Sequence, residues 1–290
     1  MYKNIKGLLQ LAKEKNVFIS EIVLQSEMKH SELSREDILN IMRERADVMR
    51  KSSVKALEKA TNPEGNFICG IAKTQYDYAV SSKESLCGDF INTVMARALS
   101  SSEVNASMGK ICAMPTAGSC GIVPAVIFSV AEKNNVSEEK LLMAMITASG
   151  FGAIVTENAT VAGAEGGCQA ECGVAAAMAA AAAVELCGGT PEQSVTAFSL
   201  SLMNVMGLVC DPVGGLVQIP CAQRNASQAV NALLSADLAM AGVQSYIDAD
   251  EVVEAMYKVG KMLPMQLKET ALGGIACTAS GKAIVGCNCN

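Results

Sequence analysis

The chain has 290 residues, half of them hydrophobic, and its formal net charge at pH 7 is −6. A chain of this length can bury a full core as one large domain or two modest ones. The acidic balance and the lack of a basic cluster argue against a nucleic-acid partner, because Lys and Arg hold such partners. Aromatic residues make up 4% of the chain and Trp is absent, which favours close-packed helices over β-sheet. We therefore expect an all-α fold.

Residues 1–60 have the pattern of charged amphipathic helices, and we expect them to form a peripheral helical arm. Ser34 and Asp37 have the spacing of a capping box at the start of one of these helices. The first residues keep their charges through the apolar stretch and lack a small-residue cleavage site, so they do not predict a signal peptide. His30 is the only histidine, and its Met, Lys and Ser neighbours indicate a solvated surface residue.

The less charged main part of the chain begins after a turn cluster at residues 61–65. Residues 115–121, PTAGSCG, predict a small-residue loop whose backbone N–H groups can converge on an anion, although a plain helix-start turn also explains them. Ser137 begins a helix that we expect to end at Gly150–Gly152. The longest uncharged run, residues 111–131, is broken by Pro and Gly, so we expect no membrane span and a cytoplasmic protein.

Glycine, cysteine and polar residues are densest between residues 156 and 226. The stretch TENATVAGAEGGCQAECG, residues 156–173, predicts a loop between apolar helices, and a loop in that position is usually a functional site. An alanine-rich helix follows and ends at Gly188–Gly189. Thr190, Pro191 and Gln193 then predict a helix start, and that helix leads to Cys210. The segment after Gly273 shows little helical character.

Twelve cysteines are a large number for a chain without a secretion signal, and reducing compartments disfavour disulfides. Cys168, Cys210 and Cys221 lie at bends beside Gly or Pro, where the backbone can approach an inorganic centre. Three thiolates without histidine suit an iron–sulfur cluster, whereas structural zinc commonly takes four ligands in paired knuckles. Buried inert thiols remain an alternative. We prefer that alternative for the other cysteines outside the C-terminal tail, namely Cys69, Cys87, Cys112, Cys120, Cys172, Cys187 and Cys277.

Four motifs in this order resemble the iron–sulfur-dependent L-serine dehydratase family, and specifically the α (catalytic) subunit of its two-subunit form. They are MPTAGSCGIVPA (114–125), TENATVAGAEGGCQAECG (156–173), CDPVGGLVQIPCAQRNA (210–226) and LKETALGGIA (267–276). The resemblance extends over nearly the whole chain and is weakest in the first sixty residues. It implies one all-helical catalytic domain over residues 1–290, with the arm at 1–60 and a cysteine-bearing tail at 277–290.

The resemblance further implies a [4Fe–4S] cluster that is held in the core by Gly- and Cys-rich loops, with Cys168, Cys210 and Cys221 as ligands. The implied reaction is the deamination of L-serine to pyruvate and ammonia, in which an open iron acts as a Lewis acid on the substrate hydroxyl. Related single-chain enzymes carry a further α/β domain that is missing here. A separate β subunit is therefore expected.

Further site residues follow from the resemblance. The expected substrate-binding residues are Thr116, Ala117, Gly118 and Ser119 for the carboxylate, and Asn158 and Glu165 for the ammonium group. Lys268 is a weaker candidate for the carboxylate, and Arg224 is expected to pair with Asp211 or with the cluster charge. In the tail, Cys287, or Cys289, is a possible ligand to the open iron until substrate displaces it. No residue is identified as the general base.

Two other functions remain as alternatives. A pyridoxal-phosphate dehydratase would need a lysine in a distinctive environment, and the sequence shows none. A helical zinc-binding or scaffolding subunit without catalysis of its own would use the same cysteines for structure. The metal that the purified protein carries separates these interpretations.

Overall fold

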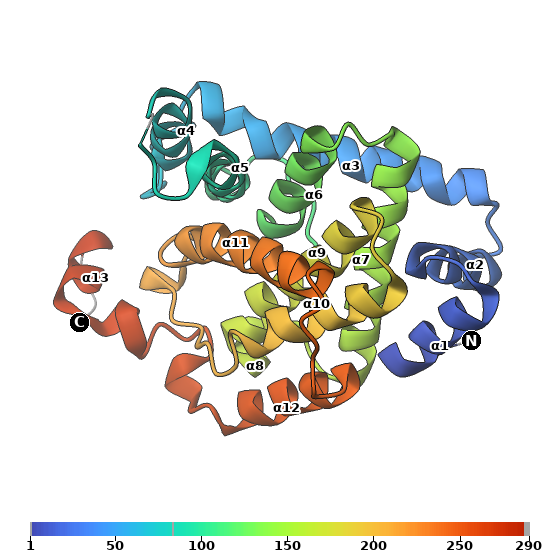
Figure 1. Cartoon of the computed structure of the whole chain (residues 1–290). Helices are drawn as coiled ribbons and strands as arrows, with labels where there is room; N and C mark the ends of the chain where they lie inside the picture. Colours follow the sequence, from blue (N-terminus) through green and yellow to red (C-terminus); the bar gives the residue numbers. More distant parts are fainter. Residues whose placement is uncertain (1, 83, 287–290) are drawn as a thin grey trace.

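The computed structural model describes residues 2–82 and 84–286, and this part of the chain forms helices and no strand (Figure 1). In chain order the elements are α1 (Ile5–Lys15), α2 (Ile19–Ser31), α3 (Arg35–Glu58), α4 (Ile71–Ser81), α5 (Gly88–Ala106), α6 (Ile122–Lys133), α7 (Glu138–Asn158), α8 (Gly163–Gly166), η1 (Gln169–Gly173), α9 (Val174–Leu186), α10 (Pro191–Met203), η2 (Val213–Gly215), α11 (Cys221–Met240), α12 (Ala249–Met262), η3 (Met265–Leu267), η4 (Gly274–Cys277) and α13 (Ala279–Ile284). The expected all-α fold is confirmed.

Helix α9 is the centre of the molecule. It lies among α6, α7, α10 and α11, and nearly all of its residues are buried (Figure 1). Its sequence is mostly alanine, and these small side chains let the neighbouring helices approach closely while keeping helix propensity high. A helix that is apolar on all sides is stable only when it is surrounded in this way. The neighbouring helices therefore pack around this alanine-rich helix.

Two segments are long and apolar enough to cross a membrane, namely α7 and the stretch Gln169–Leu186. In their most apolar windows, 67% and 94% of the residues are buried inside the protein. Their apolar side chains are therefore already covered by neighbouring helices.

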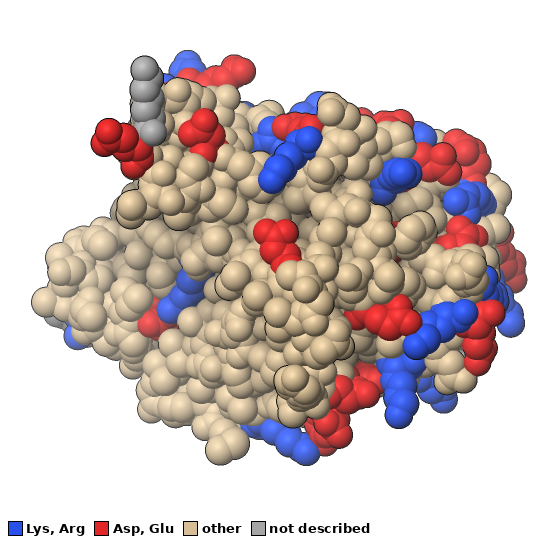
Figure 2. Space-filling model, in the orientation of Figure 1, with Lys and Arg blue, Asp and Glu red and all other residues tan. Residues whose placement is uncertain are grey.

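Helices α1–α3 lie on one outer side of the molecule, yet their inner residues join the common core. Ile5, Leu8, Leu24, Met49 and Ala56 are all buried in the same apolar cluster as α7 and α9. Many of the charged side chains seen in Figure 2 gather at the right edge, where Figure 1 places α1 and α2, whereas the left edge around α13 shows few. The first sixty residues thus contribute one charged face and part of the core.

The predicted helix starts are confirmed. Ser34 and Asp37 form a reciprocal capping box at α3, and Thr190 with Gln193 forms another at α10. Ser137 caps α7 by accepting a hydrogen bond from the Lys140 N–H. Such capping residues are reliable signs of a helix start, because their side chains accept hydrogen bonds from backbone N–H groups that have no partner in the first turn.

Two predicted boundaries are wrong. Helix α7 does not end at Gly150–Gly152 but continues to Asn158. A Cβ on Gly150 would lie 2.3 Å from Val23 Cγ2, and one on Gly152 would lie 2.7 Å from Met178 Cε, so these glycines admit neighbouring side chains inside a continuing helix. The segment after Gly273 also forms two short helices, η4 and α13, where little helical character was expected. In both segments the secondary structure depends on packing against other elements, which the local sequence does not show.

Candidate metal centre

The three cysteines that the sequence singled out come from three different segments. Cys168 directly precedes the π-helical turn η1, Cys210 lies in the link after α10, and Cys221 is the first residue of α11. All three are buried. Burial raises the pKa of Cys210, and it raises that of Cys221 to about 12, while the negative charge of Cys168 raises both further. The charge of Cys168 therefore acts on both of the other thiols.

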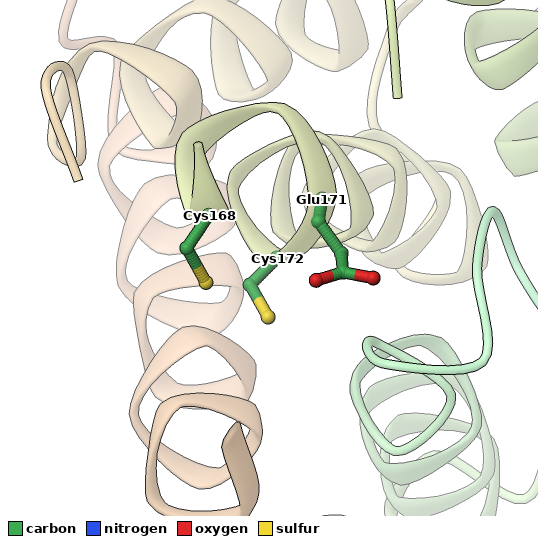
Figure 3. A group of neighbouring side chains, drawn as sticks. All are labelled: Cys168, Glu171 and Cys172. Atoms are coloured by element: carbon green, nitrogen blue, oxygen red, sulfur yellow. The ribbon is translucent and has the colours of Figure 1, made fainter. Parts of the chain in front are cut away.

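A fourth thiol and a carboxylate belong to the same cluster. One ligand atom from each of Cys168, Glu171 and Cys172 can lie within 4.8 Å of the other two, and the three side chains leave the η1 turn on the same side (Figure 3). A hydrogen bond between the two thiols lowers the pKa of Cys168 and raises that of Cys172. Cys172 is buried, as expected, and its thiol lies beside that of Cys168 and the carboxyl group of Glu171. The wider turn of a π-helix is a common feature of functional sites.

Glu171 connects this turn to the small-residue loop. Thr116 Oγ1 donates a hydrogen bond to Glu171 Oε1 at 2.5 Å, and a Cβ on Gly118 would lie only 2.4 Å from the same oxygen. Burial raises the pKa of Glu171, and the nearby charge of Glu269 raises it further, although the Thr116 hydroxyl opposes the shift. Glycine is required at position 118 because the loop backbone lies against this carboxyl group.

The loop presents two free amide groups. The N–H groups of Ala117 and Gly118 donate no hydrogen bond to any of residues 2–82 or 84–286, whereas Ser119 N–H donates to Thr116 Oγ1. Gly118 is buried, and a buried donor without an acceptor needs an explanation. The arrangement suits an anionic group that accepts from both amides.

The fourth motif reaches the thiols through a backbone bridge. Cys210 N–H donates to Leu267 O at 2.9 Å, and Glu269 N–H donates to Cys210 O at 2.7 Å. A Cβ on Gly163 would lie 3.1 Å from Cys210 Sγ, 3.3 Å from Glu171 Oε2 and 3.4 Å from Glu269 Oε2. A thiol and two carboxylates therefore surround the position of Gly163, and any larger residue there would displace them.

Arg224 supplies a positive charge beside the thiols. Its Nη2 atom lies 2.8 Å from Asp211 Oδ1, and its Nη1 atom donates to Val209 O at 2.8 Å. The other carboxylate oxygen of Asp211 accepts from Ile275 N–H at 2.7 Å. The predicted pairing of Arg224 with Asp211 is confirmed, and this ion pair fixes the chain on both sides of Cys210.

Two further predicted residues, Asn158 and Glu165, are exposed. Asn158 is exposed at the end of α7, where its side chain donates to Lys3 O and Ile154 O. Glu165 is exposed on α8. Cys287 and Cys289 fall outside the described residues. Among the cysteines expected to be buried and inert, Cys87, Cys187 and Cys277 are exposed instead.

The donor set fits a metal cofactor. Burial opposes the thiolate forms of Cys210 and Cys221, and a bound cation removes that penalty because it deprotonates a coordinating thiol. Sequence reasoning missed Glu171 and Glu269. Both lie inside the motifs quoted above, Glu171 in QAEC and Glu269 in KET. An acidic residue within a cysteine- or glycine-rich motif was the sequence signal that could have identified them.

The chain is similar to known proteins over nearly its whole length. Residues 14–276 match the family model described as "Serine dehydratase alpha chain". The chain is 48% identical to the L-serine dehydratase alpha chain of Peptoniphilus asaccharolyticus, over 98% of this chain and 97% of that one. It is 45% identical to the probable L-serine dehydratase alpha chain of Bacillus subtilis, over 98% and 94%. It is 35% identical to an L-serine dehydratase of Streptomyces coelicolor, over 93% of this chain but 59% of that protein. The chain belongs to the serine dehydratase alpha chain family.

Proposed function

We propose that this protein is the catalytic α chain of an L-serine dehydratase, which converts L-serine to pyruvate and ammonia. We further propose a [4Fe–4S] cluster as its cofactor, held by Cys168, Cys210 and Cys221. The observation that supports the proposal is the buried group of Cys168, Glu171 and Cys172, in which Glu171 accepts a hydrogen bond from Thr116 of the small-residue loop, with the position of Gly163 close to both Cys210 Sγ and Glu171. Thiolates are the usual ligands of such clusters, and three of them leave one iron open.

The chemistry needs help at two atoms of the substrate, because the hydroxyl of L-serine is a poor leaving group and its α-proton is weakly acidic. A bound iron with an open position supplies a Lewis acid for the hydroxyl. Loss of water gives an enamine, which hydrolyses after release to pyruvate and ammonia. The protein's own residues bind and orient the substrate, and such positioning lowers the barrier by avoiding entropy loss in the reaction step.

We assign the substrate carboxylate to the loop Thr116–Ser119, where the amides of Ala117 and Gly118 lack acceptors among the described residues. The hydroxyls of Thr116 and Ser119 lie beside them, 3.0 Å apart. We assign the ammonium group to the side of the pocket that carries Glu171 and Glu269, since opposite charges attract most strongly where water is excluded. Binding by Asn158 and Glu165 stays a prediction.

We propose a separate β chain as partner. The chain covers nearly all of two relatives that are named alpha chains but 59% of the longer Streptomyces protein. A second polypeptide would supply what the longer protein carries in one chain. It is also a source for a histidine base, because the single histidine here, His30, is exposed on α2.

The test compares two cysteine variants after anaerobic cluster reconstitution with the β chain. Cys168→Ala is expected to lose the cluster's visible absorption and the formation of pyruvate from L-serine. Cys69→Ala is the matched control, because Cys69 lies outside the thiol cluster and its Sγ donates to Thr61 O. Full activity of Cys168→Ala, or of the wild type after complete iron removal, would refute the metal role. Stoichiometric zinc without iron or sulfide would support a zinc-binding subunit instead.

A further inference from the structure

We infer that Asn225 is a positioning residue that fixes the loop Thr116–Ser119 against the metal centre. The inference rests on the proposed function, because it assumes that this loop binds the substrate. Asn225 lies on α11, one helical turn after the proposed ligand Cys221, and is 1% exposed. It occurs in the motif CAQRNA, in which only Cys221 and Arg224 were assigned a role from sequence.

The side chain of Asn225 uses both ends of its amide to hold the loop. Its Nδ2 donates to Gly118 O at 2.7 Å and to Cys221 O at 2.9 Å, and its Oδ1 accepts from Gly121 N–H at 2.9 Å. A buried amide with every polar atom satisfied holds one geometry, because any movement leaves a buried group without a partner. The loop is thus joined directly to the first turn of the helix that carries Cys221.

Close contacts on the other sides remove the loop's remaining freedom. A Cβ on Gly121 would lie 2.3 Å from Ala98 O, and a Cβ on Gly118 would lie 2.4 Å from Glu171 Oε1. The loop therefore lies between α5, the η1 turn and α11. Because Asn225 holds the Gly118 carbonyl, it restrains the loop backbone that carries the neighbouring Ala117 and Gly118 N–H groups.

The substitution Asn225→Asp separates positioning from packing. It keeps the size of the side chain and the acceptor for Gly121 N–H, but it replaces the amide donor with a carboxylate oxygen that faces the Gly118 and Cys221 carbonyls. The loop is expected to move away from this oxygen. Substrate binding should weaken, while the thiols should still hold the cofactor, because the hydrogen bonds of the Asn225 side chain go to the backbone of Gly118, Gly121 and Cys221 and not to a thiol.

Asn231→Asp is the matched control. Asn231 is also a buried asparagine on α11, and its Nδ2 donates to Ser201 O at 3.0 Å and to Ser201 Oγ at 3.2 Å. These bonds join α11 to α10 rather than to the loop. The two variants therefore make the same chemical change on the same helix. Asn225→Asp acts on the side that faces the loop, and Asn231→Asp acts on the side that faces α10.

The experiment measures three quantities on the reconstituted complex with its β chain, under anaerobic conditions: KM and kcat for L-serine, iron content, and amide hydrogen exchange in peptides covering residues 112–125. For Asn225→Asp we expect at least a tenfold rise in KM, a smaller change in kcat, unchanged iron and at least tenfold faster exchange in the loop. Asn231→Asp should lower the melting temperature without these changes.

Wild-type exchange and KM in Asn225→Asp would overturn the inference, and so would equal effects in Asn231→Asp. If Asn225→Asp does not fold, Asn225→Gln takes its place, because one extra methylene displaces the loop while keeping both polar groups. Inactivity of the wild-type complex towards L-serine would contradict the proposed function alone. The exchange rates of the loop would still decide the role of Asn225.

Discussion

Glu185 shows how one buried carboxyl group makes stability depend on pH. It lies near the end of the central helix α9, where its Oε2 accepts hydrogen bonds from Thr147 Oγ1 at 2.6 Å and from Ser20 N–H at 3.4 Å. Burial raises its pKa above the ordinary value of 4.5, and these hydrogen bonds only partly oppose the shift. The folded protein therefore holds the proton of Glu185 more tightly than the unfolded chain does.

The sign of the resulting pH dependence follows from this difference. As pH rises above about 4.5, the unfolded chain loses the proton first, so the free energy of unfolding falls until the folded carboxyl also ionises. Glu185→Gln removes this loss and keeps an acceptor for Thr147. We expect its melting temperature to gain on that of the wild type as pH rises through this window.

Thermal unfolding from pH 4 to pH 8 tests this prediction, with the exposed Glu157→Gln as the control for removal of one charge. A constant difference between Glu185→Gln and wild type across the window would contradict it. The same result in the Glu157→Gln control would also contradict it, because the effect would then come from net charge.

At the level of single residues, the sequence proposes the three metal ligands but does not show the residues around them. Cys168, Cys210 and Cys221 are visible because each lies beside Gly or Pro. Glu171 and Asn225 cannot be recognised from the sequence as residues of the site. Each one contacts the loop Thr116–Ser119 only because its side of the η1 turn or of α11 faces that loop. The local sequence shows which residue stands at each position. It does not show which residue of another element that side chain will contact.

Among the elements, α7 shows where local signals fail. Two glycines two residues apart predict a helix end, but the helix continues because Val23 and Met178 fill the space beside them. Each glycine costs about 1 kcal/mol of helix propensity relative to alanine. Close approach of α2 and α9 to α7 offsets that cost, and sequence alone does not show which helices will meet.

The two glycines should respond differently to substitution by alanine. In Gly150→Ala the new Cβ would lie 2.3 Å from the branched Val23 side chain, and overpacking of this kind costs about 1–3 kcal/mol, which exceeds the gain in propensity. In Gly152→Ala the contact is with the end of Met178, a flexible side chain that can move away.

We therefore expect Gly150→Ala to lower the free energy of unfolding by up to about 2 kcal/mol, and Gly152→Ala to be near neutral. Chemical denaturation of both variants measures the difference. Equal stability of the two variants would contradict the proposed role of Val23 packing.

For the whole molecule, the order of the helices explains how distant cysteines meet. Cys168 lies just before η1 and α9, and Cys210 lies just after α10, which packs against α9. Because the chain runs out along α9 and back along α10, its two ends return to the same place. The first residue of α11, Cys221, follows after the short turn η2. The all-α fold was predictable from composition. The packing of α10 against α9, which brings the two ends of this segment together, was not predictable from the sequence.

The most direct test of the account is the visible spectrum of the anaerobically reconstituted chain with its β partner, recorded before and after addition of L-serine together with iron and sulfide content. The account predicts about four iron and four sulfide per α chain, as a [4Fe–4S] cluster requires, and a spectral change on adding L-serine because the substrate reaches the open iron. Iron-free protein that still forms pyruvate, or a fully loaded cluster whose spectrum does not respond to L-serine, would contradict it.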